Sequence, residues 1–170
     1  STQGTQEHAS GPNDYAAALS TAAMLSDVGY EVVRAASRQE AIDVAHYAYT
    51  RQTKRAFVHI FDGAYAACER SVLSPPSSKV PEPCTYTGPS APATALVMPH
   101  GAMSHRARAL LLSLPPHLRG KVGIVSVRRL GSWDAAVLRR VVPTSVQTLR
   151  VVEEACSSAE GALDARSLIR

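Results

Sequence analysis

The side chains that could do chemistry in this chain follow two expected strands. RAFVHIFDG (residues 55–63) is typical of a buried strand that ends at Asp62 and Gly63, and TALVM (residues 94–98) is soon followed by His100, Gly101 and Ser104. Ligands of α/β proteins bind beyond the carboxyl ends of parallel strands. These five residues are therefore the candidate ligand-binding residues. At His100, Gly101 and Ser104 the ligand would be a small anion, held by the free N–H groups of a helix N-terminus.

No catalytic set accompanies these residues. His100 and His105 are five positions apart, so they do not stack on one helical face, and neither HExxH nor CxxC occurs. The chain has no G-x-S-x-G elbow and no glycine-rich phosphate loop. We therefore expect no metal site and no catalytic residue, and we interpret Asp62 and Gly63 as a turn or cap after a strand.

Length and composition indicate one ordinary domain, or a small domain with a partial one appended. The chain has 170 residues, of which 45% are hydrophobic and 19% charged, as in globular proteins. No apolar run approaches the roughly 20 residues that a membrane helix needs, so we expect no membrane partner. Cys68, Cys84 and Cys156 are odd in number and widely spaced, which favours free thiols in a reducing, cytoplasmic compartment.

Nucleic-acid binding is the weakest of the functions that the charge pattern leaves open. The net charge is only +4, and the basic residues are scattered apart from the pairs Arg128/Arg129 and Arg139/Arg140. Aromatic side chains that could stack on bases are also scarce. Binding through these four arginines would predict an affinity that falls steeply with salt.

The order of expected elements predicts an α/β fold made of parallel sheet layers with flanking helices. Residues 1–12 are a polar lead-in, expected to be flexible. Residues 13–73 predict helix, strand, helix and strand at 14–27, 30–36, 38–53 and 56–63, with Ser37 and Glu40 as a capping box. Residues 74–93 contain six prolines, so we expect an extended linker that does not pair in a sheet.

Residues 94–170 predict strand and helix three times over. Strands are expected at 94–98, 121–127 and 148–154, and a terminal helix at 159–169. Ser104 is expected to cap the first helix and Ser132 the second. The side chains expected to face the sheet are Ala107, Leu110, Leu111 and Leu114 in the first helix, and Trp133, Ala136, Val137 and Val141 in the second.

Two long stretches carry a family resemblance. EVVRAASRQEAIDVAHYAYTRQTKRAFVHIFDGAYAACERSVL (residues 31–73) resembles the end of the first domain of pyruvate:ferredoxin (flavodoxin) oxidoreductases. ALVMPHGAM (residues 95–103) and GKVGIVSVRRLGSWDAAVLRRVVPTSVQTLRVVEE (residues 120–154) resemble the domain that follows it in the same enzymes. The sequence departs from the family pattern at residues 64–68, where a polar segment is replaced, and at residues 130–132, where the family has Arg-Pro-Phe.

The resemblance implies two partial domains. Residues 13–73 would belong to a domain like the pyrimidine-binding domain of thiamine diphosphate enzymes, and residues 94–170 to one like the C-terminal domain of transketolase. The family's cofactor-activating glutamate, pyrophosphate-binding domain and iron-sulfur cysteines have no counterpart here. The resemblance therefore implies that the chain does not run the oxidoreductase reaction alone.

A block of this kind also resembles the N-terminal region of the sulfite reductase flavoprotein component and of diflavin reductases of the cytochrome P450 reductase type. This implies a non-catalytic scaffold or docking module without a cofactor of its own. Its partners would be the other domains or subunits of a parent oxidoreductase that uses FAD, FMN and NADPH. The alternative, from a different class, is a regulatory domain that binds a small anionic metabolite.

Overall fold

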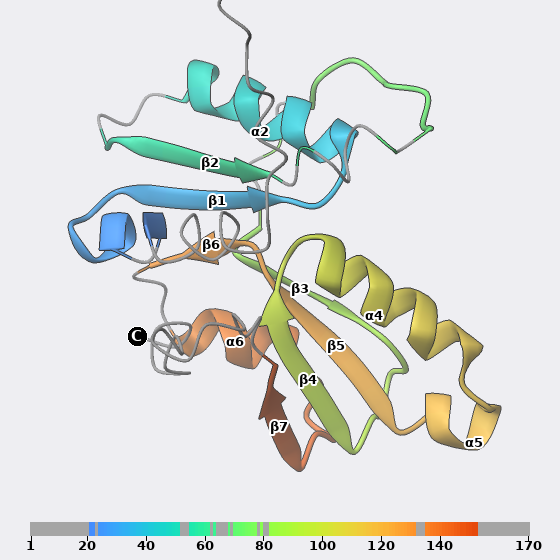
Figure 1. Ribbon diagram of the computed structural model, residues 1–170. Coiled ribbons are helices and arrows are strands. Elements are labelled where there is room, and N and C mark those ends of the chain that lie inside the picture. Colours follow the sequence, from blue (N-terminus) through green and yellow to red (C-terminus); the bar gives the residue numbers. More distant parts are fainter. Residues whose placement is uncertain are drawn as a thin grey trace, which may run out of the picture.

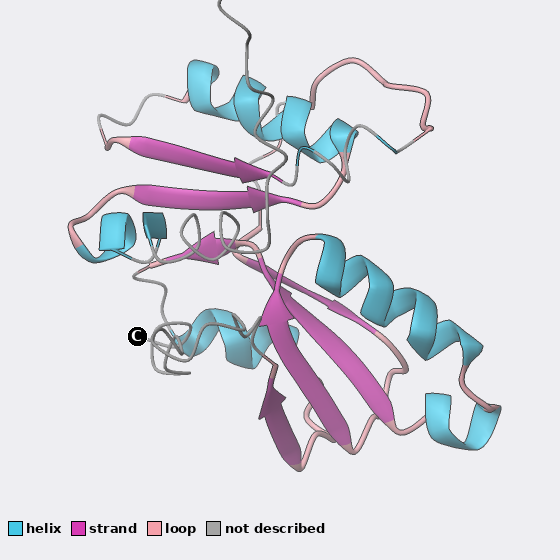
Figure 2. Ribbon diagram, in the orientation of Figure 1, coloured by secondary structure: helices cyan, strands magenta, loops and turns pink. Residues whose placement is uncertain are grey.

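The computed structural model describes residues 21, 22, 24–51, 55–61, 63, 68, 70–77, 79, 82–131 and 135–152. These residues form a three-stranded and a four-stranded sheet with helices packed on them (Figures 1 and 2). The α/β class is confirmed. The expectation of purely parallel layers is wrong, because each sheet contains one antiparallel pair of strands.

The three-stranded sheet has the order β2-β1-β6. Strands β1 (Glu31–Ala35) and β2 (Phe57–Phe61) pair in parallel, and the short β6 (Arg129–Leu130) pairs antiparallel with β1. Helix α2 (Arg38–Thr50) connects β1 to β2 and packs Val44 against Val33 and other apolar side chains of the sheet. This strand, helix, strand unit is the one that the apolar pattern predicted.

The four-stranded sheet has the order β3-β5-β4-β7. Strand β4 (Thr94–Pro99) lies in the middle and pairs in parallel with β5 (Val122–Val127) and β7 (Thr148–Val151). Strand β3 (Cys84–Thr87) pairs antiparallel with β5 at one edge. Strand β3 was not among the expected elements, and neither was the short β6 of the other sheet.

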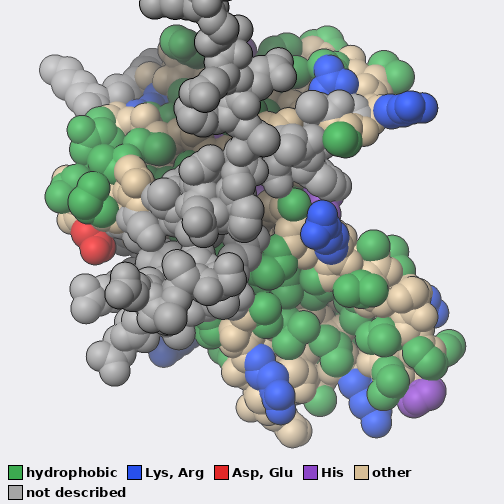
Figure 3. Space-filling model, in the orientation of Figure 1, with side chains coloured by type: hydrophobic (Ala, Val, Ile, Leu, Met, Phe, Trp, Pro, Cys, Tyr) green, Lys and Arg blue, Asp and Glu red, His purple; other side chains and the backbone are tan. Residues whose placement is uncertain are grey.

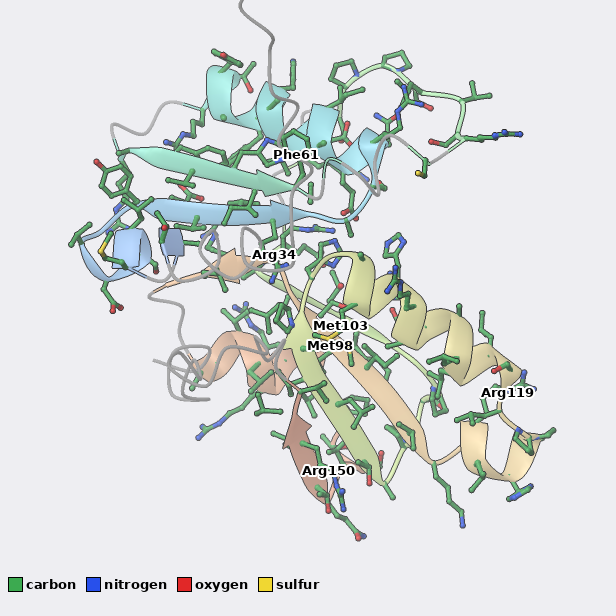
Figure 4. The ribbon with its side chains drawn as sticks, viewed as in Figure 1. Arg34, Phe61, Met98, Met103, Arg119 and Arg150 are labelled. Carbon is green, nitrogen blue, oxygen red and sulfur yellow. The ribbon has the colours of Figure 1, made fainter. Side chains whose placement is uncertain are left out.

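Two apolar cores lie on opposite faces of the four-stranded sheet, because side chains alternate along its central strands. Val125 and Val127 of β5 pack with α6 (Ala135–Val141), whereas Ile124 packs with α4 (Ala102–Ser113). The short helix α5 (Pro116–Arg119) follows α4 (Figure 1). In Figure 4, Met98 of β4 and Met103 of α4 lie together on the α4 side.

One segment joins the two sheets. The chain leaves β5 at Val127, passes Arg128 and enters β6, which pairs with β1 of the other sheet. The Arg34 N–H of β1 donates to the Arg128 carbonyl at 2.9 Å, and the Arg128 N–H donates to the Pro83 carbonyl at 2.8 Å. The backbone on both sides of Arg128 is therefore hydrogen-bonded to both halves of the molecule.

Several expectations about single elements are wrong. Four residues of the proline-rich stretch do pair in a sheet, as β3, because the prolines at 83 and 89 lie outside the paired residues. Helix α4 begins before Ser104, with Gly101 as its N-cap, and Ser104 lies in the first turn. Leu110 and Ala136 are exposed instead of facing the sheet.

Other expectations fall on residues that the structure does not describe. The expected helix at 14–27 is described only at its end, where residues 21, 22 and 24–27 are helical. The lead-in, the terminal helix, Ser132 and Trp133 lie outside the described residues. The described strand β7 ends at Val151, and Glu153, Glu154 and Cys156 lie beyond the described part.

Gly123→Ala tests the packing of β5 against β3. Its position on β5 lies under the Tyr86 ring of β3, so that a Cβ added there would overlap the ring. Gly123→Ala should lower the free energy of unfolding by about 1 to 3 kcal/mol, the usual cost of overpacking. Gly120→Ala is the matched control, because its added Cβ would make only an ordinary contact, 3.5 Å from the Pro116 oxygen.

Urea unfolding followed by circular dichroism measures both variants. Adding Tyr86→Leu to Gly123→Ala should recover part of the lost stability, because the obstructing ring is gone. Equal stabilities of the Gly123 and Gly120 variants would contradict the packing described here.

Candidate functional site

The strand ends of the two sheets meet at three polar side chains, Glu40, His100 and Arg128, which we call the junction cluster. One Glu40 carboxylate oxygen lies 2.6 Å from His100 Nε2, and the other accepts a hydrogen bond from Arg128 at 2.8 Å. Glu40 comes from the first turn of α2, whereas His100 and Arg128 follow β4 and β5. The cluster therefore connects one sheet's helix to the other sheet's strand ends.

Local capping holds Glu40 in place. Ser37 is the N-cap of α2, and its hydroxyl oxygen accepts a hydrogen bond from the Glu40 N–H at 3.1 Å. The Glu40 carboxylate accepts in return from the Ala36 N–H at 2.8 Å. The predicted capping box is confirmed, with the return bond one residue earlier than usual. The same carboxylate therefore caps its own helix and binds the other sheet.

His100 is buried at the end of β4. It is 1% exposed, and its backbone N–H donates to the Val127 carbonyl at 2.8 Å. Burial lowers the pKa of His100, and although Glu40 acts in the opposite direction, the positive charges of Arg128 and Arg108 reinforce the lowering. Because His100 Nε2 lies beside a carboxylate oxygen, this nitrogen carries a proton. His100 Nδ1 is buried and has no hydrogen-bond partner among the described residues.

Glu40 is held as a carboxylate. Burial by itself raises the pKa of Glu40, but the His100 ring, the Arg128 guanidinium and the Ala36 N–H outweigh it and lower the pKa to about 2. The junction cluster thus places the Glu40 carboxylate between an imidazole and a guanidinium. Both carboxylate oxygens accept hydrogen bonds from protein groups.

A second ion pair lies beside the junction cluster. Arg129 donates to Glu31 of β1 at 3.0 Å, and Arg51 at the end of α2 binds the other oxygen of the same carboxylate. The Arg51 guanidinium also lies 4.5 Å from the centre of the Phe57 ring. Arg128 and Arg129 are adjacent, so their side chains point in opposite directions and reach different carboxylates.

Three of the five predicted ligand residues lie together at the junction. His100 is buried, Ser104 is 0% exposed, and Gly101 adopts a φ of 151°, which favours glycine. The Ser104 hydroxyl donates to the Gly101 carbonyl at 2.9 Å. A Cβ on Gly101 would lie 3.3 Å from the Arg34 guanidinium, and Figure 4 shows Arg34 between the sheets.

The other two predicted residues are not part of this cluster. Gly63 is exposed and follows β2, the outer strand of the three-stranded sheet. Asp62 lies outside the described residues. The predicted site therefore divides into a buried group at the junction and a separate position at a sheet edge.

Sequence reasoning missed the role of Glu40, Arg34 and Arg128 in this site. Glu40 was assigned only to capping, and Arg128 only to a basic pair. A signal was available, because Arg34 lies within the apolar strand β1 and Arg128 directly follows the apolar strand β5. A cation in a buried strand needs a carboxylate partner.

The described residues offer no group of three His, Cys, Asp or Glu side chains that could hold a metal ion. Cys68 is an exposed free thiol and Cys84 a buried one, whose pKa is raised by burial and by Glu82.

In the described part of the chain, no helix is long and apolar enough to cross a membrane. A scan against protein-family models and a search of curated proteins both found no match to this chain.

Glu40→Gln tests the junction cluster. The substitution keeps the shape of the side chain and removes the charge, which leaves Arg128 without its counter-ion. The free energy of unfolding at pH 7 should fall by about 1 to 3 kcal/mol. Glu82→Gln, at an exposed position, is the matched control and should change it by less than about 0.5 kcal/mol.

The pH dependence of this loss distinguishes charge from shape. Because the folded pKa of Glu40 is about 2 against a usual value of 4.5, its charge stabilises the fold above about pH 4.5 and this contribution is lost as the pH falls toward 2. The difference in the free energy of unfolding between the wild type and Glu40→Gln should therefore decrease from pH 5 to pH 2.5 in urea titrations. A difference that does not change with pH would contradict the ionic role.

Proposed function

We propose that this chain is a non-catalytic scaffold and docking module of a multidomain oxidoreductase. The observation that carries the proposal is the junction cluster. The place where an α/β protein ordinarily binds a ligand is filled by Glu40, His100 and Arg128, which bind one another. Polar groups at the strand ends thus hold the two sheets together, which supports a structural role.

The burial of the candidate ligand residues supports the same function. His100 and Ser104 have almost no exposed surface, and the Ser104 hydroxyl is bonded to the first turn of its own helix. An anion would have to displace these contacts to reach the N-terminus of α4. Binding of a small anionic metabolite is therefore the less favoured alternative.

The basic pairs support structural roles more than nucleic-acid binding. Arg128 and Arg129 are the first pair, and they are bonded to Glu40 of α2 and Glu31 of β1. Only the second pair, Arg139 and Arg140 in the last turn of α6, is exposed. Half of the arginines that would bind phosphates are thus already neutralised within the protein.

The parent enzyme is inferred from the resemblance to pyruvate:ferredoxin oxidoreductases and diflavin reductases. We propose that residues 13–73 are a partial pyrimidine-binding-like unit and residues 94–170 a transketolase C-terminal-like unit. The strand, helix, strand order of β1, α2 and β2 and the parallel β4, β5 and β7 are compatible with this assignment. FAD, FMN and NADPH would be bound by other domains of the parent.

Thiamine diphosphate binding tests the loss of catalytic function. Isothermal titration calorimetry of this chain with thiamine diphosphate and Mg²⁺ should give no saturable heat, because the strand ends are filled by protein side chains. A transketolase titrated under the same conditions is the positive control. Tight, saturable binding would contradict the scaffold proposal.

The less favoured alternative has its own experiment. A thermal-shift screen with inorganic phosphate, citrate and nucleotides should leave the melting midpoint unchanged for every compound. A shift of the melting midpoint that grows with ligand concentration and disappears in Ser104→Ala would contradict the scaffold proposal and support an anion-binding domain.

A further inference from the structure

His100 has a buried ring nitrogen without a hydrogen-bond partner. The side chain is 1% exposed, and nothing among the described residues bonds to its Nδ1. The other ring nitrogen, Nε2, carries its proton toward a Glu40 carboxylate oxygen at 2.6 Å. A second proton on this ring therefore has to be placed on Nδ1.

Protonation of Nδ1 is unfavourable while the junction cluster is closed. The new N–H would be a buried donor without an acceptor, which loses its hydrogen bonds to water and gains none in return. The ring would also become a cation, with the Arg128 Nη2 atom 3.3 Å from its Nε2. Both costs are relieved when water reaches the ring.

Most of the charged groups around the ring are basic. They come from β1, α4 and the turn after β5, namely Arg34, His105, Arg108 and Arg128. The Arg34 guanidinium lies beside Gly101, the residue that follows His100, and the ring centres of His105 and His100 are 6.3 Å apart. A protonated His100 would therefore add positive charge to a region that is already rich in it.

Glu40 of α2 only partly balances this positive charge. Among the described residues, it is the one carboxylate that is bonded to His100. It already accepts hydrogen bonds from Arg128 at 2.8 Å and from the Ala36 N–H at 2.8 Å. Its attraction for a protonated ring is therefore shared with these other donors.

We infer that the junction cluster is a pH-sensitive contact, which protonation of His100 at mildly acidic pH releases. The contact between α2 and the end of β4 opens, whereas the pairing of β1 with β6 still connects the two sheets. This inference goes beyond the scaffold function, because it concerns the response of this chain to pH and needs no parent enzyme.

The pH range follows from the direction of the pKa shift. Burial lowers the pKa of His100 below its usual value of 6.5, and Arg128 and Arg108 act in the same direction, while Glu40 opposes them. Because the pKa is lower in the closed state than in the open one, the contact is fully stable above about pH 6.5 and loses stability as the pH falls from there through the lowered pKa. Glu40, with a pKa of about 2, stays ionised over this range.

Hydrogen exchange of single backbone amides, measured by NMR from pH 7.5 to pH 5, tests the inference. The reporters are the N–H groups of His100 and Arg34, which donate to backbone carbonyls at the end of β5 and in the turn after it. Their protection factors, which correct for the intrinsic exchange rate at each pH, should fall by about tenfold. The control is the Thr94 N–H at the other end of β4, which donates to the Lys121 carbonyl and should change by less than about twofold.

Matched histidine variants assign the response to one ring. His100→Gln keeps an N–H that can reach Glu40 but cannot take up a second proton, so the protection of the Arg34 amide should change by less than about twofold over the same range. His59→Gln removes a partly buried histidine of β2, whose pKa burial also lowers, and His117→Gln removes an exposed one of α5. Both of these controls should keep the wild-type response.

The wild-type ring provides a second measurement, which does not depend on a variant that folds. The chain has six histidines, and Figure 3 shows histidine side chains over only small areas of the visible face, among the atoms that are coloured. The ring signals of His100 should titrate below pH 6.5. Their midpoint should coincide with that of the loss of protection at Arg34.

Four results would overturn the inference: junction amides whose protection does not fall with pH, an equal fall in His100→Gln, a parallel fall at Thr94, which would mean that the whole chain unfolds, or a His100 ring that titrates above pH 6.5. Circular dichroism first establishes that each variant is folded at pH 7.5.

The scaffold proposal and the pH-sensitive contact can fail separately. Thiamine diphosphate binding would end the scaffold proposal without bearing on the response of the free chain to pH. A junction that does not respond to pH would leave the scaffold proposal in place.

Discussion

The arrangement of the molecule depends on the nine residues from Val122 to Leu130, which belong to both sheets in turn. As β5 they form the second central strand of the four-stranded sheet, and as β6 they form an edge of the three-stranded sheet. Because a backbone hydrogen-bonded on both sides cannot rotate freely, the turn at Arg128 sets the angle between the sheets. The β1, α2 and β2 unit and the four-stranded sheet are each positioned by this one segment.

Ion pairs also connect the two sheets, in addition to the backbone hydrogen bonds. The shared segment carries two adjacent, partly buried arginines, and each is paired with a carboxylate. Glu31 begins β1, and Glu40 follows the end of the same strand in the first turn of α2. Partly buried ion pairs of this kind add specificity of arrangement more than net stability, because desolvation offsets much of their attraction. The pairing thus favours one orientation of the two sheets over alternatives of similar apolar burial.

Much of the local structure could be predicted from the sequence, because local structure depends on local patterns. Ser37 and Glu40 at capping-box spacing did begin a helix, and the apolar runs that became β1, β2, β4 and β5 were predicted as strands. The pairing of β3 was missed because proline density outweighed a paired segment of only four residues.

The site could be predicted only in part. His100, Gly101 and Ser104 follow one strand, so their proximity can be derived from the sequence. Glu40 and His100 are 60 positions apart in the chain, and they meet only because the two sheets pack against each other. No periodicity encodes that contact. Likewise, the buried stripe of α4 consists of Met103, Ala107, Leu111 and Leu114, and Leu110 lies just outside it, a difference of one residue that the spacing of apolar residues could not resolve.

The pairing of β1 with β6 has a consequence for the order of events in folding. Val32 pairs with Leu130, a residue synthesised almost a hundred positions later. Contacts of such sequence separation close slowly and are absent until the later segment is available. During synthesis, one edge of β1 is therefore an unprotected strand edge while the next half of the chain is being made, and a nascent chain in this state is open to pairing with other chains.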